Sequence, residues 1–251
     1  MMLLLDLIGS FSDALDVFDS QEALFRALSS ICRQAGFTYF AISHHGDFAQ
    51  ARPDLVHLHN YPPAFAGFHD GSGLGVRDPV HRASQLRGSG FLWSTLPDLL
   101  NHLTADDIDV LERAEAAGIG PGYTRPFHVP GERSGSASFA MTSGMVFPKS
   151  RIAIAEALGA FAFEAGRALT ERQDPAWIRQ GWLTDRERQI VMLLGHGKGE
   201  KEIARRLEIS PTTVNDHLKH ARARYGIHKS SLLIVCALLT GSISYSELLT
   251  D

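Results

Sequence analysis

The sequence predicts two domains of different class: an α+β domain, in which a central antiparallel sheet lies between helices as an α-β-α sandwich, and then an all-α domain of four helices. Three observations support this prediction. Alternating and helical hydrophobic patterns are mixed up to residue 169, whereas only helical patterns follow residue 182. A polar stretch ending in Asp174-Pro175 separates the two parts. The charge also changes sign: from Ala176 onward the chain carries eleven Lys and Arg against eight Asp and Glu, although its overall net charge is -4.

The first domain is predicted to alternate helices and strands. Apolar residues recur at helical spacing over residues 10–35, and Thr104 is a favourable cap for an acidic helix over residues 104–117. A turn at Pro130-Gly131-Glu132 joins two strands as a hairpin, which indicates an antiparallel sheet. Strands are expected at residues 37–43, 55–60, 123–129 and 136–142, and a long helix at 150–169.

The helix expected at 150–169 is apolar nearly all round, which indicates burial on more than one face. One face is expected to cover the sheet. The other carries Gly159 and Gly166, one heptad apart, and two explanations are open. The glycines allow a second copy of this helix to approach closely at a dimer interface, or the helix lies wholly inside its own domain.

The expected domain boundaries are 1–172 and 182–251, with a linker at 173–181 that follows the end of the long helix.

The apolar start of the chain lacks a basic region and a small-residue cleavage site, and no apolar run reaches the roughly 20 residues of a membrane span. Cys32 and Cys236 lie in apolar helical patterns of different domains, which favours free thiols. We therefore expect a soluble cytoplasmic protein with no membrane partner.

The last domain carries helix-start signals in a regular order. Thr184 and Glu187 have the spacing of a capping box, and Gly197 suits the end of the helix that they start. A second helix is expected at 200–207, and Ser210 and Pro211 suit the cap and first turn of a third. A fourth is expected at 230–239. This order is typical of a helix-turn-helix module. In this chain the third helix is the one expected to bind DNA.

The third helix has one apolar and one polar side. Val214, Leu218, Ala221 and Tyr225 fall within about 60° of one another, so this side must face inward. The polar side would then enter a major groove. The predicted DNA-contacting residues are Thr212, Thr213, Asn215, Asp216, Lys219, His220 and Arg222. The basic residues expected near phosphates are Lys201, Arg205, Arg206, Arg222 and Arg224.

Two alternatives stay open for this helix. The polar side is a solvated face of an ordinary helical bundle, or it binds DNA as described. Asp216 repels phosphate, so on a DNA-binding face it either accepts from a cytosine amino group or pairs with His220 or Lys219.

Aromatic residues are unusually dense between the expected elements of the first domain: Tyr61, Phe65, Phe68, Phe91 and Trp93. Asp78-Pro79 lies among them. A buried carboxylate without a donor costs several kcal/mol, so either the protein or a ligand must supply one. The alternative is an Asp-Pro turn at the surface beside an ordinary core.

Other motifs are weaker. Four histidines, His44, His45, His57 and His59, raise the question of a metal site, and His57 and His59 share one strand face. No third ligand is marked, so neither a metal nor another cofactor is expected. The glycines at 118, 120 and 122 follow a helix and suit a tight turn rather than a nucleotide-binding loop. No Gly-x-Ser-x-Gly elbow or His-Glu-x-x-His motif occurs, so no catalytic residue is expected and an enzyme is the least favoured class.

Over essentially its whole length the chain resembles the LuxR family of quorum-sensing regulators. The last domain resembles the LuxR-type helix-turn-helix at Glu187 and Gly197, with Val191 in place of the usual leucine. Tyr61-Pro62, Asp78-Pro79, Trp93 and Gly122 recur at the spacings of the family's autoinducer-binding domain. Two positions differ, since the family's usual tryptophan is Phe65 here and its usual tyrosine is His69.

The resemblance implies a receptor for N-acyl homoserine lactones. Asp78 would accept the ligand's amide N–H, Tyr61 and Ser138 would lie near the acyl carbonyl, and Trp93 would wall the headgroup pocket. Phe65 lacks the indole N–H that binds the lactone carbonyl in the family, and His69 is a substitute donor. Such a bond is worth roughly 0.5 to 1.5 kcal/mol, so its loss alone would not abolish binding. The expected ligand-binding residues are Tyr61, Phe65, His69, Asp78, Trp93 and Ser138.

The predicted function is that of a ligand-responsive transcriptional regulator. It binds a small amphipathic signal and, as a homodimer, a pseudo-palindromic operator in double-stranded DNA, with RNA polymerase a candidate further partner. The alternative is a transcription factor of the same fold that senses a non-lactone small molecule or a protein partner.

Overall fold

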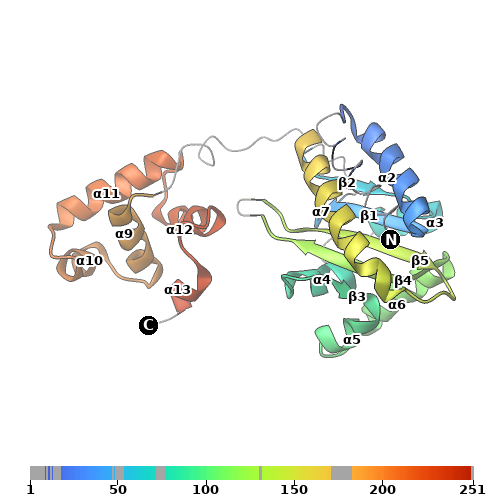
Figure 1. Cartoon of the computed structure of the whole chain (residues 1–251). Coiled ribbons are helices and arrows are strands. Elements are labelled where there is room, and N and C mark those ends of the chain that lie inside the picture. The colour runs from blue at the N-terminus through green and yellow to red at the C-terminus, as the bar shows by residue number, and fades with distance from the viewer. Residues whose placement is uncertain are drawn as a thin grey trace. The chain divides into compact units, whose positions relative to one another are not determined.

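A computed structural model describes residues 18–46, 54–71, 77–129, 132–170 and 183–249, together with Gly9, Phe11, Asp13 and Phe48. Apart from residues 129–132, the chain divides into two compact units, one up to residue 172 and one from residue 173 (Figure 1). The start of the helix expected at 10–35 and the turn residues Pro130 and Gly131 lie outside the described part. Within that part, no helix has the length and hydropathy needed to cross a membrane.

The first unit is built on an antiparallel sheet with the strand order β2-β1-β5-β4-β3. The strands are β1 (Tyr39–His44), β2 (His57–His59), β3 (Phe91–Leu92), β4 (Ile119–Phe127) and β5 (Gly135–Thr142). Ile42 of β1 pairs with Ala137 of β5, and Phe139 of β5 pairs with Tyr123 of β4. The central strand β5 is buried along nearly its whole length, as expected for a strand with both faces covered.

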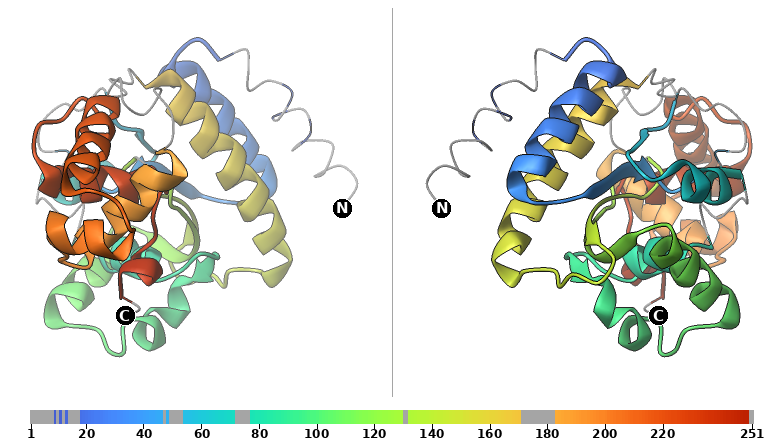
Figure 2. Two further views of the ribbon diagram at one scale, coloured as in Figure 1. Left: turned by 90° about the vertical axis from the view of Figure 1, so that its left-hand side faces the viewer. Right: turned by 90° about the vertical axis from the view of Figure 1, so that its right-hand side faces the viewer.

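Helices cover both faces of this sheet (Figure 2). On one face α7 (Ile152–Leu169) packs on β1, β4 and β5, with α2 (Gln21–Ala35) beside it. On the other, α4 (Pro79–Gln85) and α6 (Ala105–Ala116) contact β4, and α3 (Pro63–Gly71) and α5 (Leu96–Leu99) accompany them. The predicted α-β-α sandwich is thereby confirmed.

The glycines of α7 face their own domain, so their interpretation as a dimer interface is wrong. A Cβ atom added at Gly159 would lie 2.9 Å from the Ala137 side chain, and one at Gly166 would lie 2.8 Å from Val56. Both glycines therefore allow α7 to lie close against the sheet and the chain that enters β2. The alternative of a helix wholly inside its own domain is not met either, because Ala153, Glu164 and Ala168 of α7 are exposed.

The glycines at 118, 120 and 122 also differ from the prediction of a tight turn. Gly118 has φ +90° and does form the turn after α6, but Gly120 and Gly122 lie within β4. The register shifts between Ile119 and Gly122, which marks a bulge, and Gly120 lies against the backbone of Thr142. These two glycines are selected by close packing in a strand rather than by a turn.

The second unit contains α9 (Asp185–Gly195), α10 (Glu200–Arg206), α11 (Pro211–Arg224) and α12 (Ser230–Leu239), followed by a short α13 (Tyr245–Leu249). The capping box is present: Thr184 Oγ1 accepts from the N–H of Glu187 at 3.3 Å, and Glu187 accepts from the N–H of Thr184 at 2.8 Å. Gly197 has φ +74° after α9, and Ser210 caps α11. Tyr225 is fully buried in the core among the helices.

Candidate functional site

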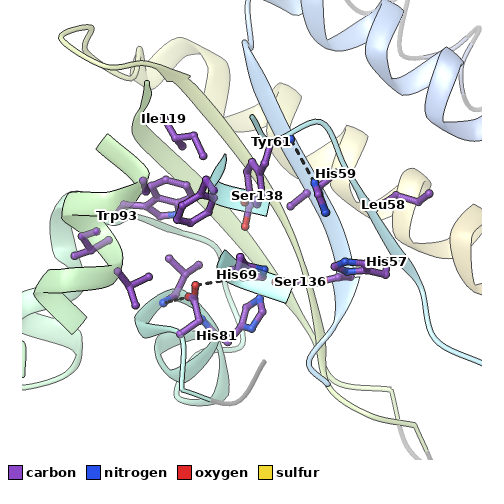
Figure 3. Close-up of a pocket in the computed structure, with 18 residues that line it drawn as sticks. His57, Leu58, His59, Tyr61, His69, His81, Trp93, Ile119, Ser136 and Ser138 are labelled. Carbon is purple, nitrogen blue, oxygen red and sulfur yellow. Dashed lines mark hydrogen bonds and ion pairs between the residues drawn. The ribbon is translucent and has the colours of Figure 1, made fainter. Parts of the chain in front are cut away.

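A pocket lies in the first unit between the sheet and the helices α3, α4 and α6 (Figure 3). The space not filled by atoms is about 580 Å³ when solvent at its opening is included, and the part that can hold the centre of a water molecule is about 30 Å³. The residues predicted to bind a ligand all line it: Tyr61, Phe65, His69, Asp78, Trp93 and Ser138. The other lining residues are Ala41, Ser43, His57, Leu58, His59, Val80, His81, Val110, Leu111, Ala114, Ile119 and Ser136.

The aromatic residues of this region divide between the pocket and the core. The ring of Tyr61 meets Phe65 edge-on at 5.4 Å between centroids, and Phe65 packs in a cluster with Ala114 of α6. Phe91 packs instead beneath α4, and Phe68 lies under the guanidinium of Arg113. Only part of the dense aromatic stretch therefore forms the wall of the pocket.

Asp78 is the buried acid of the pocket, with 6% of its surface exposed, so the alternative of a surface turn is wrong. Its Oδ1 caps α4, accepting from the N–H groups of Val80 at 2.7 Å and His81 at 3.1 Å. Its Oδ2 lies 3.5 Å from Nε2 of His69. Burial raises the pKa of Asp78, but His81 and His69 outweigh this and lower that pKa well below its usual range. The protein thus supplies donors that the sequence left open to either protein or ligand.

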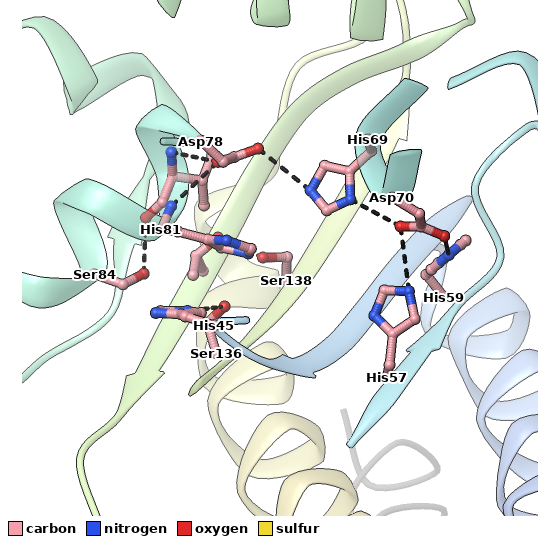
Figure 4. Close-up of polar contacts among 12 residues, drawn as sticks. His45, His57, His59, His69, Asp70, Asp78, His81, Ser84, Ser136 and Ser138 are labelled. Carbon is pink, nitrogen blue, oxygen red and sulfur yellow. Dashed lines mark hydrogen bonds and ion pairs between the residues drawn. The ribbon is translucent and has the colours of Figure 1, made fainter. Parts of the chain in front are cut away.

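His69 connects two carboxylates. Its Nδ1 lies 3.1 Å from Asp70 Oδ1, and its Nε2 faces Asp78 (Figure 4). Burial alone would lower the pKa of His69, but the bonds to Asp70 and Asp78 raise it to about 9. At neutral pH the ring is therefore protonated, and it places an N–H donor and a positive charge beside the buried acid.

Trp93 and Ser138 belong to one hydrogen-bonded chain. The indole N–H of Trp93 donates to Thr124 Oγ1 at 2.8 Å, and Thr124 Oγ1 lies 2.8 Å from Ser138 Oγ. Gly122 makes room for the indole, because a Cβ atom there would lie 2.6 Å from the Trp93 ring. The tryptophan is thus held against β4, and Ser138 has a partner within the protein.

A second group of polar residues was not marked by the sequence analysis as part of the pocket. His81 stacks on His45 with 4.1 Å between ring centroids, and His45 Nε2 lies 3.0 Å from Ser136 Oγ. Gln85 donates to His45 Nδ1 at 2.9 Å, which leaves Nε2–H to donate to Ser136. Burial, reinforced by repulsion from His81, lowers the pKa of His45 to about 2, so this ring stays neutral. Only the contacts between α4 and the sheet bring these residues together.

The fold also supplies an acid beside His57 and His59, for which the sequence marked no third ligand. Asp70, near the end of α3, places Oδ1 3.2 Å from His57 Nε2 and Oδ2 3.3 Å from His59 Nε2. His44 points elsewhere, accepting from the N–H of Val56 at 2.9 Å. Asp70 was overlooked because it lies eleven residues after His59 in the sequence.

The second unit presents the third helix as predicted. Val214, Leu218, Ala221 and Tyr225 are buried, which confirms the inward side of α11. Of the predicted DNA-contacting residues, Thr212, Asn215, Asp216, Lys219 and His220 are exposed, and Thr213 and Arg222 are half-buried.

Some residues of this surface already have partners. Arg222 donates to Ser230 Oγ at 2.7 Å, and Arg224 pairs with the buried Glu187 at 3.1 Å, so both stabilise the unit itself. Lys201 and Arg205 are exposed. Asp216 forms no ion pair with any described residue, so the expected pairing with a neighbouring base is not seen.

Comparison with known proteins gives two family matches. Residues 20–169 match the family model described as autoinducer binding domain, and residues 182–237 match that of bacterial regulatory proteins of the luxR family. The transcriptional activator protein LuxR of Aliivibrio fischeri is 23% identical over 237 residues, which cover 92% of each chain. RpaR of Rhodopseudomonas palustris, a quorum sensing-dependent transcriptional regulator, is 27% identical over 235 residues, which cover 92% of this chain and 94% of RpaR.

A solved structure of SdiA, a regulatory protein of Escherichia coli, in complex with octanoyl-rac-glycerol has the same fold. Its TM-score is 0.61 at 21% identity, and the alignment covers 96% of this chain and 97% of that one.

Proposed function

The chain belongs to the LuxR-type family of autoinducer-binding transcriptional regulators, and on this premise we propose that its signal is an N-acyl homoserine lactone. The family is one of regulators and not of enzymes. The observation that carries the proposal is a buried carboxylate, Asp78, at the polar end of a pocket whose other walls are largely apolar.

In this proposal the ligand's polar and apolar parts occupy different ends of the pocket. The amide N–H donates to Asp78, and the acyl carbonyl accepts from Tyr61. His69 can supply the donor that Phe65 lacks by releasing Asp78, because both of its N–H groups face carboxylates in the absence of a ligand. The acyl chain of the ligand packs against α6 at Val110, Leu111 and Ala114, where each buried methylene contributes about 0.8 kcal/mol.

A second candidate is an amphiphile without a lactone, such as a monoacylglycerol. It is favoured by the loss of the indole donor at Phe65 and by the donors that Asp78 already has within the protein. The structure of SdiA with octanoyl-rac-glycerol shows that this fold is compatible with such a molecule in that protein.

The proposed output is the binding of a pseudo-palindromic operator by a dimer, with Thr212, Asn215, Lys219 and His220 in the major groove. The exposure of these side chains on the free side of α11 supports it. Leu232, Val235 and Leu239 of α12 are 47%, 48% and 39% exposed and share one helix face, which supports pairing of the DNA-binding units. A DNA partner implies a cytoplasmic location.

Thermal melting of the full chain tests the ligand. A medium-chain acyl homoserine lactone at 100 times its Kd should stabilise the protein by about 2.7 kcal/mol. Asp78→Asn retains an oxygen that can cap α4 but leaves the protonated His69 without this carboxylate, so it should melt below the wild type and lose the ligand shift. Asp98→Asn, at an exposed acid, is the matched control.

The outcomes separate the two candidates. A shift with octanoylglycerol and none with any acyl lactone would select the second. If neither class moves the melting temperature of the wild type, the small-molecule proposal is wrong and a protein partner becomes the remaining alternative.

A further inference from the structure

His57 and His59 form a pair on the edge strand β2. Residues two apart on a strand point to the same face, and the register pairs His57 with Ser43 and His59 with Ala41 of β1. The other side of β2 has no paired strand in the described sheet. The end of α3 lies against this edge and brings Asp70 to both rings (Figure 4).

The spacing of the three groups is that of a metal centre. One atom from each residue can be chosen so that all lie within 4.8 Å of one another. The two imidazole Nε2 atoms are 3.2 and 3.3 Å from the carboxylate oxygens of Asp70. Ligand atoms on a tetrahedral Zn²⁺ with bonds of about 2.0 to 2.1 Å lie about 3.3 Å apart. Small side-chain shifts would therefore suffice for all three to bind one ion.

We propose that His57, His59 and Asp70 bind a divalent first-row transition metal ion, with Zn²⁺ as the representative ion, at the wall of the pocket. Two imidazoles and a carboxylate are a donor set suited to such ions, and three protein ligands leave one coordination position open. Both histidines also line the pocket, so water or an oxygen of a bound molecule can take that position.

The surroundings of the three ligands are those of an oriented site. His69 holds Asp70 through a contact of 3.1 Å and is itself anchored on Asp78, as outer groups hold metal-binding carboxylates. Phe48 stacks on His57 at 3.8 Å between centroids, and Tyr61 stacks on His59 at 5.1 Å. Both ring nitrogens of His57 are buried without a hydrogen-bond partner among the described residues, although Nε2 lies 3.2 Å from Asp70 Oδ1.

Metal binding has one local cost. His59 Nδ1 accepts from the backbone N–H of Tyr61 at 3.3 Å, whereas an imidazole bound through Nε2 carries its proton on Nδ1. This long hydrogen bond is therefore given up when the ion binds. The backbone amide of Tyr61 should respond to the metal, and its NMR signal is a local marker of binding.

The test uses the full chain, freed of metal with a chelator and without any signal molecule, so it is independent of the proposed function. Titration calorimetry with Zn²⁺ should show one site per chain, and Co²⁺ should give visible absorption bands. His57→Gln and Asp70→Asn should each weaken this site about 100-fold or more, and His69→Gln about 10-fold to 100-fold. His102→Gln, at an exposed histidine outside the cluster, should leave it unchanged.

Circular dichroism identifies any variant that fails to fold, and His59→Gln then replaces it. A Zn²⁺ stoichiometry and affinity that are equal in the wild type, His57→Gln and Asp70→Asn would overturn the proposal and assign the binding to other histidines. The absence of Zn²⁺ and Co²⁺ binding to the wild type would also overturn it, leaving the cluster as a hydrogen-bonded group around Asp70.

Discussion

Asp78 serves the fold and the pocket through different oxygen atoms. Oδ1 satisfies two N–H groups at the start of α4, and Oδ2 faces His69 within the cavity. A carboxylate can do both because each oxygen carries two lone pairs. At the scale of residues, therefore, the same group that starts a helix also makes one end of the pocket polar. The wall beside Trp93 depends in a similar way on the missing side chain of Gly122.

Gly122→Ala should displace Trp93. The added methyl would lie 2.6 Å from the indole ring, so the ring must move and its bond to Thr124 must weaken. Overpacking of this kind costs about 1 to 3 kcal/mol. Urea unfolding should show the loss of stability, and the thermal shift with ligand should decrease. Gly67→Ala in α3 is the control, because a Cβ atom added there would meet no neighbouring atom within 4 Å. Equal stability of the two variants would contradict the prediction.

At the scale of elements, α9 and α11 are joined through one acidic side chain. Glu187 completes the capping box of α9 and also accepts from Arg224 in the last turn of α11 at 3.1 Å. The carboxylate is 3% exposed. Burial raises the pKa of Glu187, but the bonds from Thr184 and Arg224 lower it below its ordinary value of 4.5.

This coupling predicts a pH dependence. Because the pKa is lower in the folded state, the ionised Glu187 stabilises the unit above pH 4.5, and the contribution is lost as the pH falls through the folded-state value. Glu187→Gln should weaken the unit by roughly 1 to 3 kcal/mol at pH 6. The difference in unfolding free energy between the wild type and Glu187→Gln should shrink as the pH is lowered. Hydrogen exchange of the α9 amides measures it, with Glu200→Gln as the control at an exposed first-turn acid. A difference that does not vary with pH would exclude the ionised carboxylate as its source.

The exposed side of α11 predicts two different effects on DNA binding. Lys219→Ala should weaken binding to all duplexes alike and reduce the slope of log K against log salt by about 1, because a phosphate contact is lost. Asn215→Ala should instead change which sequences are selected from a random library. Lys149→Ala, on an exposed lysine of the first unit, is the control for charge. If both α11 variants behave like this control, α11 is not the reading helix.

At the scale of the whole molecule, an acidic sensor is joined to a basic DNA-binding unit. The second unit exposes Leu232, Val235 and Leu239 on one side of α12, where a soluble monomer would be expected to carry polar residues. The glycines of α7 are turned toward their own sheet, whereas in the described second unit large apolar side chains are exposed on α12 and, at Tyr245 and Leu249, on α13.

Val235→Glu should therefore weaken the dimer on DNA. Affinity for an operator with two half-sites, selected with the wild type, should fall at least tenfold because the linked binding of two units is lost. Affinity for one half-site should be unchanged. Gel-shift titrations of both duplexes measure this, with Ile108→Glu on α6 as a control at an exposed apolar residue of the first unit. Equal losses on both duplexes would place Val235 in the DNA contact rather than in the pairing of units.

Predictions from sequence succeeded where the signal was local and was recognised. The residues of α12 lie at 230–239 as expected, and Ser210-Pro211 starts α11. The same cap and proline signal occurs at Asp78-Pro79, where it starts α4, but that helix was not predicted. The short strand β3 was also missed, because two residues carry too little alternation to mark a strand.

The sequence by itself determined the two domains and most helix starts, because caps and hydrophobic periodicity act between residues at most a few positions apart. The six predicted lining residues of the pocket came instead from the resemblance to the family, and the other lining residues were not predicted. Tertiary structure alone decided which groups meet. The placement of Asp70 between His57 and His59, the donors around Asp78 and the inward turn of Gly159 and Gly166 all depend on contacts between distant segments. Such contacts are selected by the packing of the whole core, and no short stretch of sequence contains that information.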